Sequence, residues 1–509
     1  MFSLSPIEEN RLRRLLAALA EEIDVPESKY EEAHQHYRAV GDWLGAEGSP
    51  LSSCDVSVFA QGSFALGTAV KPPDECDYDV DAVCLLRCAP AWSQERFKDE
   101  VGARLRAHAT YREMLKPPEG GRRCWTLQYA DASQFHLDVL PAKPDEFSWL
   151  VALGVPRHYA EPAVQITCRD CYQDPIWPKS NPGGYVRWFV DRMRVRFEEA
   201  RLVLAKARAA DVQSIPEYAV RTPLQRVVQI LKRQRDVMFG DDPDRPISIV
   251  ITTLAAHAYQ NEADLVTAYQ NIVRGMRAQI QVLNGRYVIL NPVNPLENFA
   301  DRWATHPERQ ERFFEWLAGV EETERELSEE HTFESSSDVI MKSFGASGVR
   351  AAKVAAAAFG VPSLQPLSEA VQMSQALGSV LKVAHRQNPR WPVMNTSYKA
   401  TVSAKASRTG FRTVPFSDRS PSSPLSKGMD IFFRLNTDVP GSYDVFWQVV
   451  NTGDDAAAEG SDGLRGGFDK GETKHHETTK YKGRHSIQAF VVKGNRCVAR
   501  SRPVYVLIR

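Results

Sequence analysis

The chain has 509 residues, a length typical of two to four domains, and its 63 basic residues nearly cancel its 64 acidic ones to give a net charge of −1. This balance excludes a strong overall field that attracts nucleic acid or an anionic membrane, so any site for a polyanion must be local. Eight cysteines are scattered, without a secreted disulfide framework or a secretory signal pattern, and no apolar run approaches about 18 residues. We therefore expect a cytoplasmic protein that does not associate with membranes.

The first 140 residues predict helices followed by a mixed αβ region. Apolar residues recur at helical spacing over residues 6–46, with a break at Pro26, and another helical pattern covers about residues 94–109. Shorter runs rich in β-branched and aromatic residues predict four strands, with a loop at residues 61–73 after the first. These strands are residues 56–59, 77–86, 124–129 and 134–140.

After residue 180 the sequence pattern changes twice, from helical spacing to a linker composition and then to strand alternation. Residues 181–376 are predominantly helical in pattern, and Gly, Ser and Pro then indicate a linker at residues 386–428. The tail predicts a small β-sandwich with a flexible insertion at residues 454–471, and His475 and His476 are expected in an exposed loop. The strands predicted in the tail are residues 429–436, 443–451, 485–492 and 498–508. The fold class expected from these patterns is α+β.

An acidic strand follows a glycine-containing loop within twenty residues. The loop contains Gln61, Gly62 and Ser63, and the strand carries aspartates at 77, 79 and 81, which share one face because alternate strand residues point the same way. Three carboxylates on one face favour neutralisation by hard cations, and two Mg²⁺ ions held by adjacent acids can clamp the attacking and leaving oxygens of a phosphoryl transfer.

A later strand and the loop complete this pattern. Asp138, on the strand that begins near Phe135, can join the acidic pair from a neighbouring strand. Glycine at the loop lets backbone N–H groups approach phosphate, and the Ser63 hydroxyl can donate to a phosphate oxygen. The implied reaction takes in a nucleoside triphosphate and releases pyrophosphate.

These segments together resemble the polymerase β-like nucleotidyltransferases, specifically the bacterial cyclic-oligonucleotide synthases (CD-NTases) related to cyclic GMP-AMP synthase. The residues that carry the resemblance are QGSFALGT at 61–68, DYDVD at 77–81, HLDVLP at 136–141, the WPKSNPGGYVRWF segment at 177–189 and the TPLQRVVQILKRQRD helix at 222–236. The resemblance implies a catalytic domain with N-terminal helices at 1–180, a helical substrate-binding domain at 181–385, a linker at 386–428 and a β-rich sensor-like domain at 429–509.

The resemblance also assigns site residues. It implies that Asp79, Asp81 and Asp138 hold two Mg²⁺ or Mn²⁺ ions and that Asp138 helps to activate the attacking hydroxyl, with Asp77 as an outer acid or an alternative metal ligand. Nucleotide-binding roles fall to Gln61, Gly62, Ser63, Lys232, which is expected to reach the triphosphate, and Ser248, which is expected near the nucleotide at a helix start.

The product implied is a cyclic di- or trinucleotide that activates a downstream effector, in defence against phage. The tail resembles the sensor domain found on adenylyl or guanylyl cyclases and on these synthases, which implies a regulatory ligand or protein; we expect no DNA activator, because no aromatic platform interleaves the basic residues. Two alternatives stay open: a transferase that modifies tRNA or a protein, and a pseudoenzyme that senses nucleotides.

Overall fold

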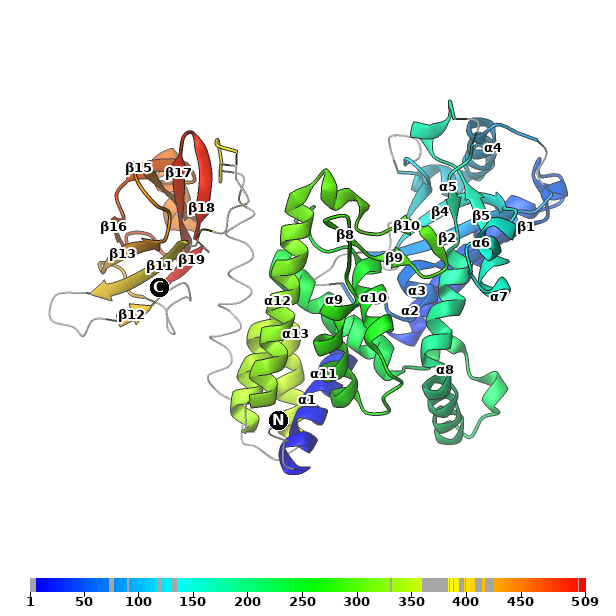
Figure 1. Cartoon of the computed structure of the whole chain (residues 1–509), viewed down its shortest axis with the longest axis horizontal. Helices are drawn as coiled ribbons and strands as arrows, with labels where there is room; N and C mark the ends of the chain where they lie inside the picture. The colour runs from blue at the N-terminus through cyan, green and yellow to red at the C-terminus, as the bar shows by residue number, and fades with distance from the viewer. Residues whose placement is uncertain are drawn as a thin grey trace. The chain divides into compact units, whose positions relative to one another are not determined.

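The structure, a computed structural model, divides into two compact units, Met1–Ala358 and Phe359–Arg509 (Figure 1). The described residues are 6–72, 77–88, 91–116, 121–129, 135–174, 176–240, 242–329, 332–358, 383, 385–387, 389–392, 398, 400–407, 414–416, 425–501 and 503–509. Residues 359–376 of the predicted helical region and Pro73 of the predicted loop lie outside them.

The first unit is built on a six-stranded mixed sheet. Its order is β1-β2-β4-β5-β6, and β3 pairs with β4 off this path. β2 runs antiparallel to β1 and parallel to β4, while β3 is antiparallel to β4. The strands are β1 (Val56–Gln61), β2 (Tyr78–Leu86), β3 (Trp125–Tyr129), β4 (Phe135–Pro144), β5 (Val164–Ile166) and β6 (Lys179–Ser180).

One face of this sheet is apolar because alternate residues of β2 and β4 are buried. Val80, Ala82, Leu137 and Val139 join the core beneath helices α2 and α4. The other alternate residues of β2 and β4 point to the opposite face and include the aspartates, as the sequence predicts. The helices of this region are α2 (Glu27–Gly45), α3 (Gly62–Ala65), α4 (Gln94–Ala107), α5 (Ala109–Met114), α6 (Ser148–Ala152) and α7 (Arg157–Ala160).

Helices form the remainder of the first unit, and α1 belongs with them. α1 (Pro6–Ile23) packs against α13 and α9, whereas α2, beyond Pro26, packs on β1. The break predicted at Pro26 therefore separates two helices with different neighbours. The other helices are α8 (Pro182–Ala207), α9 (Pro223–Phe239), α10 (Ser248–Ala258), α11 (Leu265–Met276), α12 (Pro307–Glu329) and α13 (Phe333–Ala358).

Two short hairpins interrupt the helical region, and the sequence did not predict them. β7 (Gln281–Leu283) pairs with β8 (Arg286–Val288), and β9 (Leu290–Asn291) pairs with β10 (Asn294–Asn298). Strands of two to five residues carry too little alternation to be read from a pattern. Among the described helices, none is long and apolar enough to cross a membrane.

The second unit contains two antiparallel sheets that share a core. Their orders are β12-β11-β13-β16 and β15-β14-β17-β18, with β19 pairing with β17. Trp447, Phe433 and Ile487 lie in the shared core. The strands are β11 (Ala400–Ser407), β12 (Val414–Phe416), β13 (Asp430–Thr437), β14 (Asp444–Asn451), β15 (Phe468–Gly471), β16 (Lys474–Thr478), β17 (Gly483–Lys493), β18 (Arg496–Arg500) and β19 (Val504–Ile508).

Several local expectations for the tail were wrong. β11 and β12 lie inside residues 386–428, which were expected as linker, and the strand expected at 498–508 is divided into β18 and β19. His475 and His476 lie in β16 rather than in a loop, and residues 454–471 contain α15 (Asp454–Ala458), α16 (Gly460–Gly463) and β15. The expected α+β class with a C-terminal β-sandwich is confirmed.

Candidate active site

The aspartates on β2 and β4 are brought together by the parallel pairing of these two strands. Asp81 lies directly opposite Asp138, and Asp79 lies opposite His136. All three aspartates fall on the face opposite the buried residues, because the neighbours of each acid along its strand are buried. The sequence predicted both strands, and the register that joins Asp81 to Asp138 comes from the structure.

Neighbouring polar side chains position these acids. The Thr126 hydroxyl on β3 donates to Asp138 Oδ1 at 2.5 Å. His136 Nε2 lies 2.9 Å from Asp77 Oδ2, and its Nδ1 lies 3.7 Å from Asp79 Oδ1. The Asp79 side chain is 89% exposed, so it is open to a ligand in solution. Thr126 and His136 were not singled out from the sequence.

The surroundings of Asp81 disfavour the charged form of its carboxyl group. Burial raises its pKa to about 6, the Asp138 and Asp79 carboxylates act in the same direction, and the Lys232 ammonium opposes them. Crowded carboxylates disfavour full ionisation unless a cation joins them. The cluster is therefore suited to binding positive charge.

The Gly-Ser loop lies directly against this cluster. Gln61, the last residue of β1, pairs with Asp81 across the strands, and Gly62 follows with a φ of +62°. A Cβ atom at Gly62 would collide with Asp81 Oδ2, so both the backbone conformation and the close approach require glycine. The Ser63 hydroxyl makes no hydrogen bond to any residue that the structure describes and is available to a ligand.

A row of polar side chains on α9 holds the rest of this loop. Gln225 Nε2 donates to the Leu66 carbonyl at 3.0 Å, and Gln229 Nε2 donates to the Ala69 carbonyl at 2.8 Å. Arg233 donates to the Lys71 carbonyl. The glutamines, spaced four residues apart on a buried helix, were a sequence signal for this row that pattern reading missed.

Lys232 belongs to the same row. Its Nζ donates to the Thr68 carbonyl at 3.0 Å and to the Thr68 hydroxyl at 3.1 Å, and only 4% of the residue is exposed. Burial lowers the pKa of Lys232 to about 7, with Arg235 acting in the same direction and Asp236 and Asp81 opposing. The structure thus places this lysine beneath the loop, close enough to Asp81 to interact with its charge.

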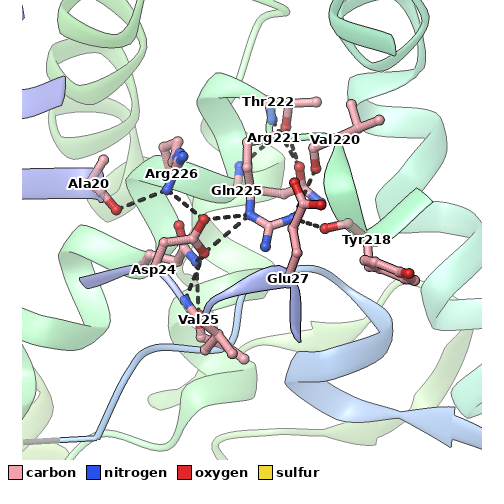
Figure 2. Close-up of polar contacts among 12 residues, drawn as sticks. Ala20, Asp24, Val25, Glu27, Tyr218, Val220, Arg221, Thr222, Gln225 and Arg226 are labelled. Carbon is pink, nitrogen blue, oxygen red and sulfur yellow. Dashed lines mark hydrogen bonds and ion pairs between the residues drawn. The ribbon is translucent and has the colours of Figure 1, made fainter. Parts of the chain in front are cut away.

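The start of α9 is fixed by a polar network around Asp24 at the junction of α1 and α2 (Figure 2). Arg221 Nε donates to both Asp24 carboxylate oxygens at 3.1 and 3.0 Å, and Arg226 Nη1 lies 2.9 Å from Asp24 Oδ2. Gln229 Nε2 also donates to Asp24 Oδ1, at 2.7 Å. A capping box between Thr222 and Gln225 begins the helix.

Ser248 is bonded to α9. It is the first residue of α10, and its hydroxyl accepts a hydrogen bond from Arg235 Nη1 at 2.8 Å. Within the described ranges no hydrogen bond joins Ser248 to β2 or β4. The structure links it to α9 through Arg235, one turn beyond Lys232.

The acids fit a metal ion that is shared with a substrate. Across the described residues, no three His, Cys, Asp or Glu side chains are gathered tightly enough to hold a metal ion by themselves. Mg²⁺ is usually held by one or two carboxylates together with waters and substrate phosphates rather than by an all-protein cage. Asp79, Asp81 and Asp138, beside a loop open to phosphate, offer this kind of partial ligand set.

Two family models match the chain, one in each unit. Residues 56–141 match the nucleotidyltransferase domain of the cyclic GMP-AMP synthase DncV-like family, and this range contains β1 to β3, most of β4, the Gly-Ser loop and the acids. Residues 381–509 match the adenylyl/guanylyl and SMODS C-terminal sensor domain. The sensor match begins before β11, so the strands inside the expected linker belong to it.

Two curated bacterial proteins are similar to part of the chain. A c-di-GMP synthase of Roseivirga ehrenbergii is 28% identical over 341 residues, which is 66% of this chain and 85% of that protein. The cyclic dinucleotide synthase CdnG of Bradyrhizobium diazoefficiens is 26% identical over 311 residues, 59% of this chain and 71% of that protein.

A solved structure shows the same fold. The CD-NTase CdnG of Bradyrhizobium diazoefficiens, in complex with GTP, aligns with a TM-score of 0.51 and 24% identity over 67% of this chain and 97% of that one. The chain therefore contains, at residues 56–141, a segment that matches the DncV-like nucleotidyltransferase domain and, at residues 381–509, a segment that matches the adenylyl/guanylyl and SMODS C-terminal sensor domain.

Proposed function

We propose that this protein is a metal-dependent synthase that joins ribonucleoside triphosphates into a cyclic dinucleotide. The observation that carries the proposal is the pairing of Asp81 with Asp138 beside the Gly62 turn, inside the range that matches the nucleotidyltransferase family. The two curated relatives, both cyclic dinucleotide synthases by name, support the choice of product.

Each group of residues has a distinct part in the proposed reaction. Asp79, Asp81 and Asp138 would hold two divalent ions, which when bound neutralise phosphate charge and favour ionisation of the attacking hydroxyl. The Gly62 and Ser63 backbone and the Ser63 hydroxyl bind the triphosphate, and the Asp138 carboxylate accepts the proton of the incoming ribose hydroxyl. Lys232 acts through Thr68, by holding the loop in its binding conformation.

Guanine nucleotides are the proposed substrates. One relative is named for c-di-GMP and the aligned solved structure holds GTP, which together favour GTP over the other triphosphates. The closing step would repeat the first, with the second hydroxyl attacking the remaining α-phosphorus and releasing a second pyrophosphate. An effector that responds to the product, and a role in defence against phage, stay predictions.

The test is a product assay with the purified protein. We would incubate it with Mg²⁺ or Mn²⁺ and either radiolabelled GTP alone or all four labelled ribonucleoside triphosphates, treat with phosphatase, and separate the surviving nucleotides. A phosphatase-resistant dinucleotide that co-migrates with c-di-GMP in both reactions is expected. Label transferred to added tRNA or to the protein, without a cyclic product, would instead favour the macromolecule-modifying alternative.

Substitutions at two aspartates distinguish synthesis at the proposed metal site from the activity of a contaminating enzyme. Asp79→Asn and Asp81→Asn, singly and together, keep the shape of the side chains and remove charge, so synthesis should fall at least about a thousandfold. Asp55→Asn is the matched control, because Asp55 precedes β1 and is exposed. Full activity in the double variant would refute the metal assignment.

A further inference from the structure

The second unit contains a cavity between its two sheets. The cavity has a volume of about 220 Å³ and is lined by β13 and β16 from one sheet, by β14, β17 and β19 from the other, and by the segment around α16. This is smaller than pockets for drug-sized ligands, which measure roughly 300–1,000 Å³, and equals the liquid volume of about seven water molecules. Its size fits a small metabolite.

The cavity lining is apolar on one side and polar on the other. Phe433, Val449 and Ile487 are buried core residues that supply apolar surface. Arg465, Lys480 and His485 supply the polar part, together with carboxylates on α16 and β16. Such a lining suits a ligand with an apolar body and a polar head.

The carboxylate from β16 is already neutralised. Arg465 Nη1 donates to both Glu477 oxygens at 2.9 Å, and His475 Nε2 lies 2.7 Å from Glu477 Oε1. Although burial acts to raise it, the hydrogen bonds from His475 and Arg465 hold the pKa of Glu477 below its usual value. Glu477 therefore contributes little uncompensated negative charge to the cavity, and Asp462 on α16 is the other lining carboxylate.

The buried histidine of the lining faces oxygen atoms on both sides. His485 is 7% exposed, its Nδ1 lies 3.0 Å from Asn451 Oδ1, and its Nε2 lies 2.9 Å from the Tyr481 carbonyl oxygen. The Asn451 amide is oriented by its Nδ2, which donates to the Gly463 carbonyl at 3.1 Å. Both oxygens can accept a hydrogen bond only from a doubly protonated ring, because a neutral imidazole has a single N–H.

A protonated His485 would be a buried cation that needs a counter-charge. Burial lowers the pKa of His485, and the bond to Tyr481 opposes that effect only in part. No carboxylate in the described part of the chain forms an ion pair with this ring. An anion entering the cavity would supply the missing charge and allow both hydrogen bonds to form.

We propose that this cavity binds a small organic anion whose apolar body lies against Phe433, Val449 and Ile487 and whose anionic head lies beside His485. The inference concerns the second unit alone, and it stands whether or not the first unit makes a cyclic dinucleotide.

A matched pair of probes tests the charge requirement. Indole-3-acetate and indole-3-acetamide have the same shape and differ in the charge of the head group, and binding of each to the full-length protein at pH 7 would be measured by titration calorimetry. The acid should bind at least tenfold more tightly than the amide. Equal affinities, or no saturable binding of the acid at millimolar concentration, would overturn the proposal.

One variant locates the binding site. His485→Gln should weaken acid binding at least tenfold and leave amide binding unchanged. His476→Gln is the control, because this histidine lies on β16 with 51% of its side chain exposed and pairs with Asp430. Acid binding unchanged in His485→Gln would overturn the proposal.

A spectroscopic measurement keeps the test decisive if His485→Gln does not fold. In protein labelled with ¹⁵N-histidine, the two ring nitrogens of His485 should both carry protons at pH 7 once indole-3-acetate is bound. Persistence of a neutral ring in the saturated complex would contradict the proposed head-group contact.

Discussion

At the scale of single residues, the site is built from an unfavourable contact between acids. Asp81 faces Asp138 across the strand pair, and Gly62 brings the loop backbone against Asp81 where no side chain fits. Both features cost stability in the absence of ligand, and both leave room and charge for a cation with its phosphates. The sequence could predict the acids and the loop because each is a contiguous pattern, but Thr126 and His136 are linked to the acids only through strand register.

The close approach at Gly62 gives a prediction with a matched control. Gly62→Ala should lower kcat/KM at least about a hundredfold, because the added methyl group displaces Asp81 or the loop. Gly48→Ala places alanine at a similarly positive φ, +80°, where nothing lies within 4 Å of the new Cβ, so it should cost about 1 kcal/mol of stability and leave turnover intact. Equal losses of activity in the two variants would contradict the proposed role of the contact.

The raised pKa of Asp81 gives a prediction about stability. Since the folded-state pKa of about 6 lies above the ordinary value of 3.8, the charged carboxylate destabilises the metal-free fold above pH 6, and this penalty is absent below pH 3.8. Asp81→Asn should therefore stabilise the metal-free protein by about 1–3 kcal/mol at pH 8. Urea unfolding should show that the substitution raises the free energy of unfolding less at pH 5 than at pH 8. A lower free energy of unfolding for Asp81→Asn at pH 8 would show that the charged carboxylate does not destabilise the metal-free fold.

At the scale of elements, the proposed phosphate site depends most on the hydrogen bonds between α9 and the loop that follows Gly62 and Ser63. Helical spacing predicted α9, and strand alternation predicted β2 and β4, because both signals are local. The hydrogen bonds from Gln225, Gln229 and Lys232 to loop carbonyls connect residues about 160 positions apart, so no local pattern contains them. The helix therefore controls the loop conformation that the proposed phosphate site needs.

A substitution at Gln229 tests whether α9 holds this loop. Gln229→Leu leaves the Ala69 carbonyl without its donor and removes one bond to Asp24, which should cost about 1–3 kcal/mol locally. Hydrogen exchange of peptides within residues 61–72 should accelerate about tenfold, and the KM for GTP should rise. Gln281→Leu, on the exposed strand β7, should change neither; unchanged exchange in Gln229→Leu would refute the holding role of α9.

At the scale of the whole molecule, the chain combines two units with separate cores. The sequence predicted a β-rich tail but missed β11, because its inward residues Val402, Ala404 and Ala406 are mostly alanine, which gives little strand signal, and the flanking segments are rich in Ser and Pro. Their burial shows that β11 is a core strand of the sandwich. An interpretation based on composition alone therefore assigned part of a folded domain to a linker.

This division predicts that damage to one core leaves the other unit folded. Trp447 is fully buried in the sandwich, where its indole Nε1 donates to the Glu472 carbonyl at 2.9 Å, so Trp447→Ala should cost about 3–5 kcal/mol in the second unit. Calorimetry of the full-length protein should show two transitions, of which only one moves to lower temperature in this variant. Because the proposed catalytic acids, the loop and α9 all lie within Met1–Ala358, synthesis from GTP at 25 °C should persist. If both transitions fell together and synthesis were lost, the sandwich would be a structural support of the catalytic unit, and the proposed ligand cavity would then act on a single cooperative molecule.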